Sequence, residues 1–377
     1  MVRNILISFS ILCSVLLMQN CVHGDLDDCP PMVRYAVAFE YTNHTGNTDR
    51  FYDDVKVINL YVFDEENLVY TTKTALSPYE TNFNIPLEEL PMGNYHIIAW
   101  GNVLNGQPFT IAPDTFIRGE TTMAEARLRL QRAADNLSQK DMEKLFYGEK
   151  QVSIPLYVSR IDTVPLINDT KWIRVVIHWD PTEEIKEDLG GVLDYNDVKV
   201  HFDASNGVSN FQNQFNPLFH SISDYTVDYN PYLSYPVKST GDLREHEIVA
   251  SYLPRDFENY VIPAAGWDTT VYDLCVLRMM PNLPLKLEII RKKKVVELSA
   301  TIFKEDIIPP LMARLDYLAS RGDIDEKANK QDYFDKYDFY RIDLYFTYDK
   351  IPGEYVTGDF QVEGWHVVHQ PTIPGAN

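Results

Sequence analysis

Short runs of β-branched and aromatic residues, separated by polar loops and prolines, recur along this 377-residue chain. Residues 171–179 form a run rich in valine, isoleucine and tryptophan, and residues 126–132 alternate polar and apolar side chains. Runs of this length and a period of two are typical of β-strands. The 24 tyrosines, 18 phenylalanines and 22 prolines also favour strands and turns over helices. The sequence therefore predicts an all-β fold.

The expected strands are spread over most of the chain. They are residues 34–41, 55–63, 68–74, 82–87, 94–100, 126–132, 151–166, 171–179, 197–202, 247–253, 271–279, 285–291, 295–299, 340–348 and 360–368. Pro86 predicts a sheet edge, because proline cannot donate to a ladder. Helices are expected at residues 138–146, after an N-capping serine, and at residues 309–319. An Asn-Gly pair predicts a hairpin turn at residues 203–207.

The chain is longer than one hydrophobic core usually serves, so we expect two domains. Residues 1–20 are a leader and residues 21–33 an acidic linker. Residues 34–166 are the expected N-terminal domain and residues 167–377 the C-terminal domain. The boundary is placed at the segment that contains Pro165.

The leader has the features of an export signal. Arg3 precedes an apolar run at residues 5–18, which is too short to span a bilayer permanently. The run leads into Cys21 and resembles a bacterial lipobox, which predicts lipidation of Cys21 and attachment to the outer membrane. The alternative is an ordinary export signal with an incidental cysteine.

Acidic residues follow Cys21 at Asp25, Asp27 and Asp28. They resemble the signal that directs lipoproteins of Bacteroides-type bacteria to the outer face of the outer membrane. The alternative is a solvated linker. Formal net charge is −21, which argues against nucleic-acid binding and against adsorption to anionic lipids by charge. Membrane attachment would therefore rest on the lipid.

Two cysteines remain after the leader is removed and Cys21 is lipidated. They are Cys29 and Cys275. In an oxidising compartment they can form a disulfide that ties the start of the first domain to the second. The alternative is that both stay unpaired as small buried hydrophobes.

The sequence has no G-x-S-x-G motif, no metal-ligand spacing and no phosphate-binding loop, so we expect no enzyme activity, metal or cofactor. His96 and His178 lie inside expected strands, so we interpret them as satisfied or solvent-facing side chains rather than as metal ligands. The turn at Asp203 lacks the ligand spacing of a calcium loop. Two pairs of acids, Asp53-Asp54 and Glu183-Glu184, are candidates for catalysis, and we interpret them as solvent-facing. A basic run at residues 291–294 is interpreted as a hairpin tip, and the alternative is a site for an acidic partner.

Several segments, taken in order, carry a family resemblance. They are Cys21 with residues 27–30, then residues 57–64, 93–100, 144–148, 173–176, 329–335 with 340–346, and 362–368. Together they resemble the fimbrial anchor-subunit family of the Bacteroidales, which are FimB-type and minor-fimbrium anchor lipoproteins. The resemblance implies two tandem transthyretin-like β-sandwich domains. It also implies a lipid-anchored subunit at the base of a surface fimbrium, joined to pilin subunits by strand addition.

Two functions follow from these expectations. The first is the basal anchor that attaches a fimbrium to the cell and limits its length. The strand at residues 360–368 is the last in the chain, so we expect it to detach from its sheet most easily in a strand exchange with a partner. The alternative is a surface glycan-binding lipoprotein of a nutrient-uptake system, because the many tyrosines and the five tryptophans can supply stacking platforms.

Overall fold

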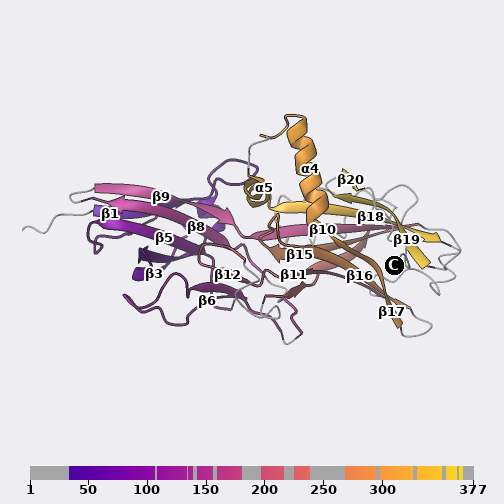
Figure 1. Cartoon of the computed structure of the whole chain (residues 1–377), viewed down its shortest axis with the longest axis horizontal. Coiled ribbons are helices and arrows are strands. Elements are labelled where there is room, and N and C mark those ends of the chain that lie inside the picture. The colour runs from indigo at the N-terminus through magenta and orange to yellow at the C-terminus, as the bar shows by residue number, and fades with distance from the viewer. Residues whose placement is uncertain are drawn as a thin grey trace, which may run out of the picture.

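Strands make up most of the structure, which confirms the expected all-β fold. The computed structural model describes residues 34–106, 108–133, 135–138, 142–155, 159–180, 197–215, 225–237, 268–293, 298–325, 329–349, 354–362 and 365–367. The molecule is elongated, with the strands that precede residue 169 at one end and most later strands at the other (Figure 1).

The first half is built on a seven-stranded sheet. Its order is β3 (Asn67–Ala75), β2 (Val57–Asp64), β5 (Gly93–Gly101), β8 (Phe146–Ile154), β9 (Ser159–Asn168), β1 (Arg34–Glu40) and β4 (Asn84–Pro86). Strand β1 runs parallel to β9, and β4 is an outer strand, as Pro86 predicts. Arg34 lies opposite Ser159, so the described chain begins at the end of this sheet that is remote from β10 (Thr170–Trp179).

The central strands of this sheet are buried on both faces. In β2, Ile58 and Val62 pack into a core that lies within the first half. Tyr61 and Phe63 point to the opposite face and join a larger core that also contains second-half residues. Successive side chains of a strand point to opposite faces. Because both faces are buried, every residue from 57 to 63 is apolar or aromatic except Asn59, which is buried as well.

The second half contains two further sheets. The six-stranded sheet has the order β14 (Leu233–Val237), β15 (Asp268–Leu277), β10, β18 (Phe339–Asp349), β19 (Glu354–Val362) and β20 (Trp365–Val367). The four-stranded sheet has the order β13 (Val227–Tyr229), β11 (Val198–Ala204), β16 (Leu285–Lys293) and β17 (Leu298–Asp306). The pairing of β16 with β17 confirms a hairpin that follows the expected strand at residues 285–291. The returning strand is described from Leu298 to Asp306, so it extends well beyond the expected residues 295–299, of which 295–297 lie outside the described residues.

A three-stranded sheet crosses between the halves, in the order β12 (Val208–Asn210), β7 (Arg127–Leu130) and β6 (Phe109–Ala112). The hairpin expected at residues 203–207 is therefore wrong, because β11 and β12 do not pair with each other. Asn206 instead donates to the Leu277 carbonyl (3.3 Å) and accepts from the Tyr229 hydroxyl (2.7 Å). These tertiary bonds outweigh the local turn preference of the Asn-Gly pair.

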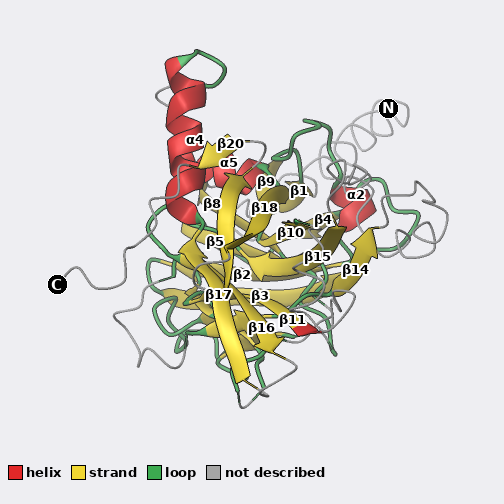
Figure 2. Ribbon diagram, turned by 90° about the vertical axis from the view of Figure 1, so that its right-hand side faces the viewer, coloured by secondary structure: helices red, strands yellow, loops and turns green. Residues whose placement is uncertain are grey.

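Three helices are described, α2 (Phe51–Asp54), α4 (Ile308–Ser320) and α5 (Lys330–Lys336). Helix α4 confirms the helix expected at residues 309–319 and projects from the body of the molecule (Figures 1 and 2). The helix expected at residues 138–146 is wrong where it is described: Ser138 forms a bridge with Arg132, and β8 begins at Phe146. The Ser138 amide donates to the Asp228 carbonyl (2.9 Å), which supplies a tertiary partner in place of a helical one.

The C-terminal strand expected at residues 360–368 is also wrong as one element. Strand β19 ends at Val362, and β20 pairs back on it in antiparallel register, with Phe360 opposite Val367. The strand expected at residues 247–253 lies outside the described residues.

The two halves meet without a long connection, because β9 ends at Asn168 and β10 begins at Thr170. The expected domain boundary at residues 166 and 167 stays a prediction. Phe211, on the loop after β12, lies near the rings of Tyr61 (4.9 Å between centroids) and Trp100 (6.3 Å) in the first half. A side chain of the second half is therefore part of the first half's packing.

Candidate functional site

Of the three cysteines expected to be lipidated or to form a disulfide, the structure describes one. Cys21 and Cys29 lie outside the described residues, so lipidation and the disulfide stay predictions. Cys275 lies in β15 and is 3% exposed. Burial raises the pKa of its thiol above the ordinary value, which makes the reactive thiolate scarce.

Both strand histidines have carboxylate partners. His96 Nε2 lies 2.6 Å from Glu149 Oε1 on the neighbouring strand β8, and this contact is the main cause that lowers the pKa of Glu149. His178 is buried and bonds Thr269 Oγ1 (3.2 Å) and Asp343 Oδ1 (3.1 Å). These histidines bridge strands of their own sheets, in line with the interpretation of satisfied structural residues.

The structure does not bring the paired acids into a shared site. Asp54 binds Arg50 and Lys144 (Oδ2 to Nζ, 3.0 Å), while Asp53 is exposed. The pair Glu183-Glu184 lies outside the described residues. Asp203 lies in the body of β11. Of the basic run, residues 291–293 form the end of β16, and Lys294 lies outside the described residues.

A buried ionic cluster lies where the halves meet, and no pattern in the sequence predicts it. Lys171 has a fully buried side chain, and its Nζ donates to Asp338 Oδ1 (3.2 Å) and to the Asp335 carbonyl (2.9 Å). The hydroxyl of Tyr41, just after β1, donates to the other oxygen of Asp338 (2.7 Å). Asp338 thus connects the start of β10 to the first half.

The cluster continues through Arg278, at the end of β15. Its guanidinium makes a bidentate pair with Asp335 of α5 (2.7 and 2.5 Å) and donates to the Asn213 carbonyl (2.8 Å). Asn213 Nδ2 donates to Asp169 Oδ1 (2.8 Å) between β9 and β10. Burial raises the pKa of Asp169 to about 7, although nearby Arg278 opposes the rise. This carboxyl is therefore partly protonated near neutral pH.

A second buried ion pair crosses the six-stranded sheet. Arg174 of β10 lies opposite Asp273 of β15, and the side chains are joined by two bonds of 2.7 and 3.0 Å. Both side chains are almost fully buried. A sequence signal existed, because Arg174 and Asp273 each lie between apolar residues within a strand. Their partnership required the register, which the sequence does not specify.

Open sheet edges are the main backbone features available to a partner. Among the described residues, β3 and β17 are nine-residue outer strands. The start of β3 is covered, because the Leu68 amide donates to the Thr121 carbonyl (2.9 Å) and the Gly119 amide donates to the Leu68 carbonyl (2.8 Å), so the open edge of β3 begins after Leu68. The lysine on each edge is engaged within its own sheet: Lys73 donates to the Val103 carbonyl (3.1 Å), and Lys304 pairs with Glu288 (3.0 Å). Unpaired outer strands can pair with an added strand.

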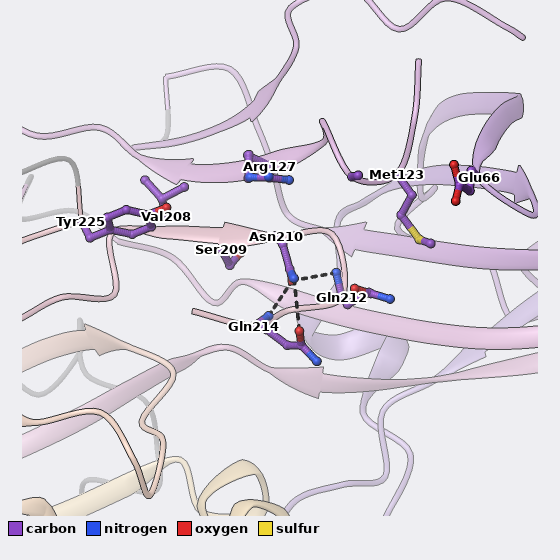
Figure 3. Close-up of a pocket in the computed structure, with 10 residues that line it drawn as sticks. Glu66, Met123, Arg127, Val208, Ser209, Asn210, Gln212, Gln214 and Tyr225 are labelled. Atoms are coloured by element: carbon purple, nitrogen blue, oxygen red, sulfur yellow. Dashed lines mark hydrogen bonds between the residues drawn. The ribbon is translucent and has the colours of Figure 1, made fainter. Parts of the chain in front are cut away.

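A pocket of about 380 Å³ lies between the first half and β12 (Figure 3). Its lining residues come from the β2–β3 turn, the segment before β7, β7 itself, β12, the loop after β12 and the segment before β13. They are Glu66, Met123, Ala124, Arg127, Val208, Ser209, Asn210, Gln212, Gln214 and Tyr225. A smaller pocket of about 250 Å³ lies between α4 and α5, beside an ion pair of Lys330 with Asp316 (2.5 Å).

The described residues contain neither a metal-binding cluster nor a membrane-spanning helix. No group of three or more histidine, cysteine, aspartate or glutamate side chains in that part of the chain is arranged to hold a metal ion. No helix there is long and apolar enough to cross a membrane. The fold defines a class, an all-β protein with open sheet edges on β3 and β17 and a pocket of mixed polar and apolar lining where its halves meet.

A comparison with known protein families gives a narrower assignment than the fold alone. The family model for the fimbrillin-A associated anchor proteins Mfa1 and Mfa2 matches residues 26–371. The chain belongs to this family. The resemblance seen in the sequence is thereby confirmed, and the family is one of fimbrial anchor proteins rather than of enzymes. It implies a fimbrial location at the cell surface.

Solved structures share the fold at low sequence identity. A Bacteroides thetaiotaomicron protein described as polysaccharide-binding is 22% identical, with a TM-score of 0.63 and coverage of 90% of this chain and 98% of that one. A Bacteroides ovatus adhesin-like protein is 17% identical, with a TM-score of 0.64 and coverage of 93% and 98%. The fimbrial anchor protein Mfa2 of Porphyromonas gingivalis is 16% identical, with a TM-score of 0.60 and coverage of 88% and 98%. None of the curated protein sequences matches the chain.

Proposed function

We propose that this protein is the basal subunit of a fimbrium, which it attaches to the outer membrane and whose length it limits. The observation that carries the proposal is the anchor-family match over residues 26–371. The two expected tandem β-sandwiches would form the body of this subunit, and a lipid on Cys21 would hold it at the cell surface.

The position of β1 suits a lipid anchor. Arg34 lies at the end of the first sheet that is remote from the second half. Thirteen residue steps separate Cys21 from Arg34, and an extended chain of that length reaches about 45 Å. The first half would therefore stand near the membrane, with the second half directed away from it.

Lipid attachment is tested by changing Cys21 to alanine. Covalent lipidation contributes about 0.8 kcal/mol per buried CH₂, and this acidic protein has little other affinity for an anionic surface. We expect Cys21→Ala to move the protein from the membrane fraction to the soluble fraction, whereas Cys275→Ala does not move it. Membrane attachment of the Cys21→Ala variant would refute lipid anchoring.

Contacts with pilin subunits would be made by strand addition. Strand β20 is a three-residue outer strand paired only with β19, so few ladder bonds are lost when it leaves. The C-terminal segment that begins with β20 is therefore our candidate for the donated strand. The open edge of β3 would be the receiving site if the protein instead accepted a strand from a partner.

Deletion of the encoding region separates this proposal from the nutrient-capture alternative. An anchor that limits length predicts overlong or shed fimbriae in the deletion strain, measured by electron microscopy and by fimbrial protein in the culture medium. Unchanged fimbriae together with lost growth on a glycan would favour the alternative instead.

A further inference from the structure

We propose that Asn105, in the turn between β5 and β6, is a site of spontaneous deamidation, and that the fold protects Asn206, which belongs to the same kind of sequence pair. The modified side chain takes no part in the lipid or strand contacts of the proposed function. The proposal therefore does not depend on whether the protein anchors a fimbrium.

The reaction needs an asparagine, the backbone amide that follows it, and water. The amide nitrogen of the next residue loses its proton and attacks Cγ of the asparagine, and ammonia leaves from that carbon. Water then opens the resulting succinimide at either of its two carbonyl carbons, which gives aspartate or isoaspartate. Glycine favours the attack, because it has no Cβ to obstruct the approaching amide. The chain contains two Asn-Gly pairs, Asn105-Gly106 and Asn206-Gly207.

The first pair is open to the reaction. Asn105 and Gly106 are both exposed, in a turn between β5 and β6. In the described part of the chain, no group forms a hydrogen bond with the Asn105 side chain or with the Gly106 amide. Gly106 has a φ of +86°, and a Cβ at this position would meet no atom within 4 Å. Neither the side chain nor the attacking nitrogen is therefore held away from the geometry of ring closure.

The second pair is held by tertiary bonds. Asn206 is 2% exposed, its Nδ2 donates to the Leu277 carbonyl (3.3 Å), and its Oδ1 accepts from the Tyr229 hydroxyl (2.7 Å). The Gly207 amide donates to the Tyr225 carbonyl (2.8 Å), so the attacking nitrogen has a partner as well. Ring closure at Asn206 would break these bonds and therefore requires local opening of the fold.

Deamidation of Asn105 changes the charge of the turn. A carboxylate replaces a neutral amide, so the formal net charge of the chain goes from −21 to −22. The isoaspartate product also lengthens the backbone by one carbon atom. The turn lies beside the outer strand β3, because Lys73 Nζ donates to the carbonyl of Val103 (3.1 Å), two residues before Asn105. The new carboxylate would therefore be formed near the one lysine of β3.

The test is incubation of the detergent-purified full chain at mildly alkaline pH, with peptide mass spectrometry at successive times. Conversion adds about 1 Da to the peptide that contains the asparagine, and an isoaspartyl methyltransferase detects the isoaspartate product separately. In the folded protein we expect Asn105 to convert at least about tenfold faster than Asn206, because Asn206 reacts only after local opening. In denaturant the two should convert at similar rates, since both precede glycine.

Two substitutions at this exposed position give matched controls. Asn105→Asp marks where the product migrates in isoelectric focusing, and Asn105→Gln has a longer side chain whose ring closure is far slower. The aged parent protein should show a new acidic band that co-migrates with Asn105→Asp and is much weaker in aged Asn105→Gln.

Three results would overturn the proposal. They are equal conversion of Asn105 and Asn206 in the folded protein, an equally strong acidic band in aged Asn105→Gln, and a rate difference that persists in denaturant, which would show that the fold does not protect Asn206. None of these results bears on fimbrial anchoring, which the Cys21→Ala and deletion experiments test.

Discussion

At the scale of single residues, Asp169 makes the stability of the junction depend on pH. Its pKa is about 7 in the folded protein, against 3.8 for an ordinary aspartate. Between these values the folded state holds a proton that the unfolded state has lost. The contribution of Asp169 to stability is therefore full below about pH 4 and is lost progressively as the pH rises to about 7.

Asp169→Asn tests this, because asparagine keeps the shape and cannot ionise. We expect the variant to be more stable than the parent protein at pH 7.5, by about 2–4 kcal/mol, and the difference to shrink toward pH 4. Denaturant titrations at several pH values measure it, with the exposed Asp53→Asn as control. A difference between variant and parent that does not change with pH would contradict the assignment.

Arg174 and Asp273 form a buried ion pair, so removing one of the two charges should destabilise the protein more than removing both. Asp273→Ala removes the carboxylate that makes two bonds to the buried guanidinium of Arg174, so we expect a loss of about 3–5 kcal/mol in the free energy of unfolding. The double variant Arg174→Met/Asp273→Leu removes both charges and should recover most of that loss. A double variant as unstable as Asp273→Ala would show that the pair is not the cause.

At the scale of elements, β12 and Phe211 couple the two halves. Phe211 is fully buried and packs among Tyr61, Trp100 and Phe116. We expect Phe211→Ala to lower the free energy of unfolding by about 3–5 kcal/mol, whereas Gln212→Ala, its exposed neighbour, should have little effect. Separate unfolding transitions for the halves in Phe211→Ala, where the parent shows one, would identify this side chain as the link.

Strand donation is also tested at this scale. Removal of residues 363–377 deletes β20 and should abolish association with the fimbrial polymer. Thr71→Pro tests the other role: the Leu76 amide donates to the Lys56 carbonyl (2.9 Å), so by alternation the amide of Thr71 points out from the open edge of β3. We expect Thr71→Pro to retain the polymer. Loss of polymer only in Thr71→Pro would mean that the protein receives a strand rather than donates one.

The sequence predicted these elements well where local pattern decides the structure. The strands at residues 171–179 and 285–291 and the helix at residues 309–319 follow from side-chain periodicity. The hairpin at residues 203–207 and the helix at residues 138–146 failed, because Asn206 and Ser138 bond to distant segments. The ionic cluster and the pocket escaped prediction for the same reason, since each joins segments that only the fold brings together.

At the scale of the whole molecule, the arrangement suits a subunit held at one end. The described chain begins at the remote end of the first sheet, and β20 lies in the second half. The ionic cluster of Lys171, Asp338 and Tyr41 and the inserted Phe211 join the halves between these points. A pull on the second half would therefore be transmitted to the first half through packed side chains as well as through the chain itself.

The most direct test of the central claim is co-purification from the native cells in mild detergent, followed by mass spectrometry of the associated proteins and of the first residue of the mature chain. Our account predicts a lipidated Cys21 and a bound fimbrillin-like polymer. A lipidated protein that instead brings an outer-membrane transporter or glycan-degrading enzymes, and no polymer, would contradict it and support the nutrient-capture alternative.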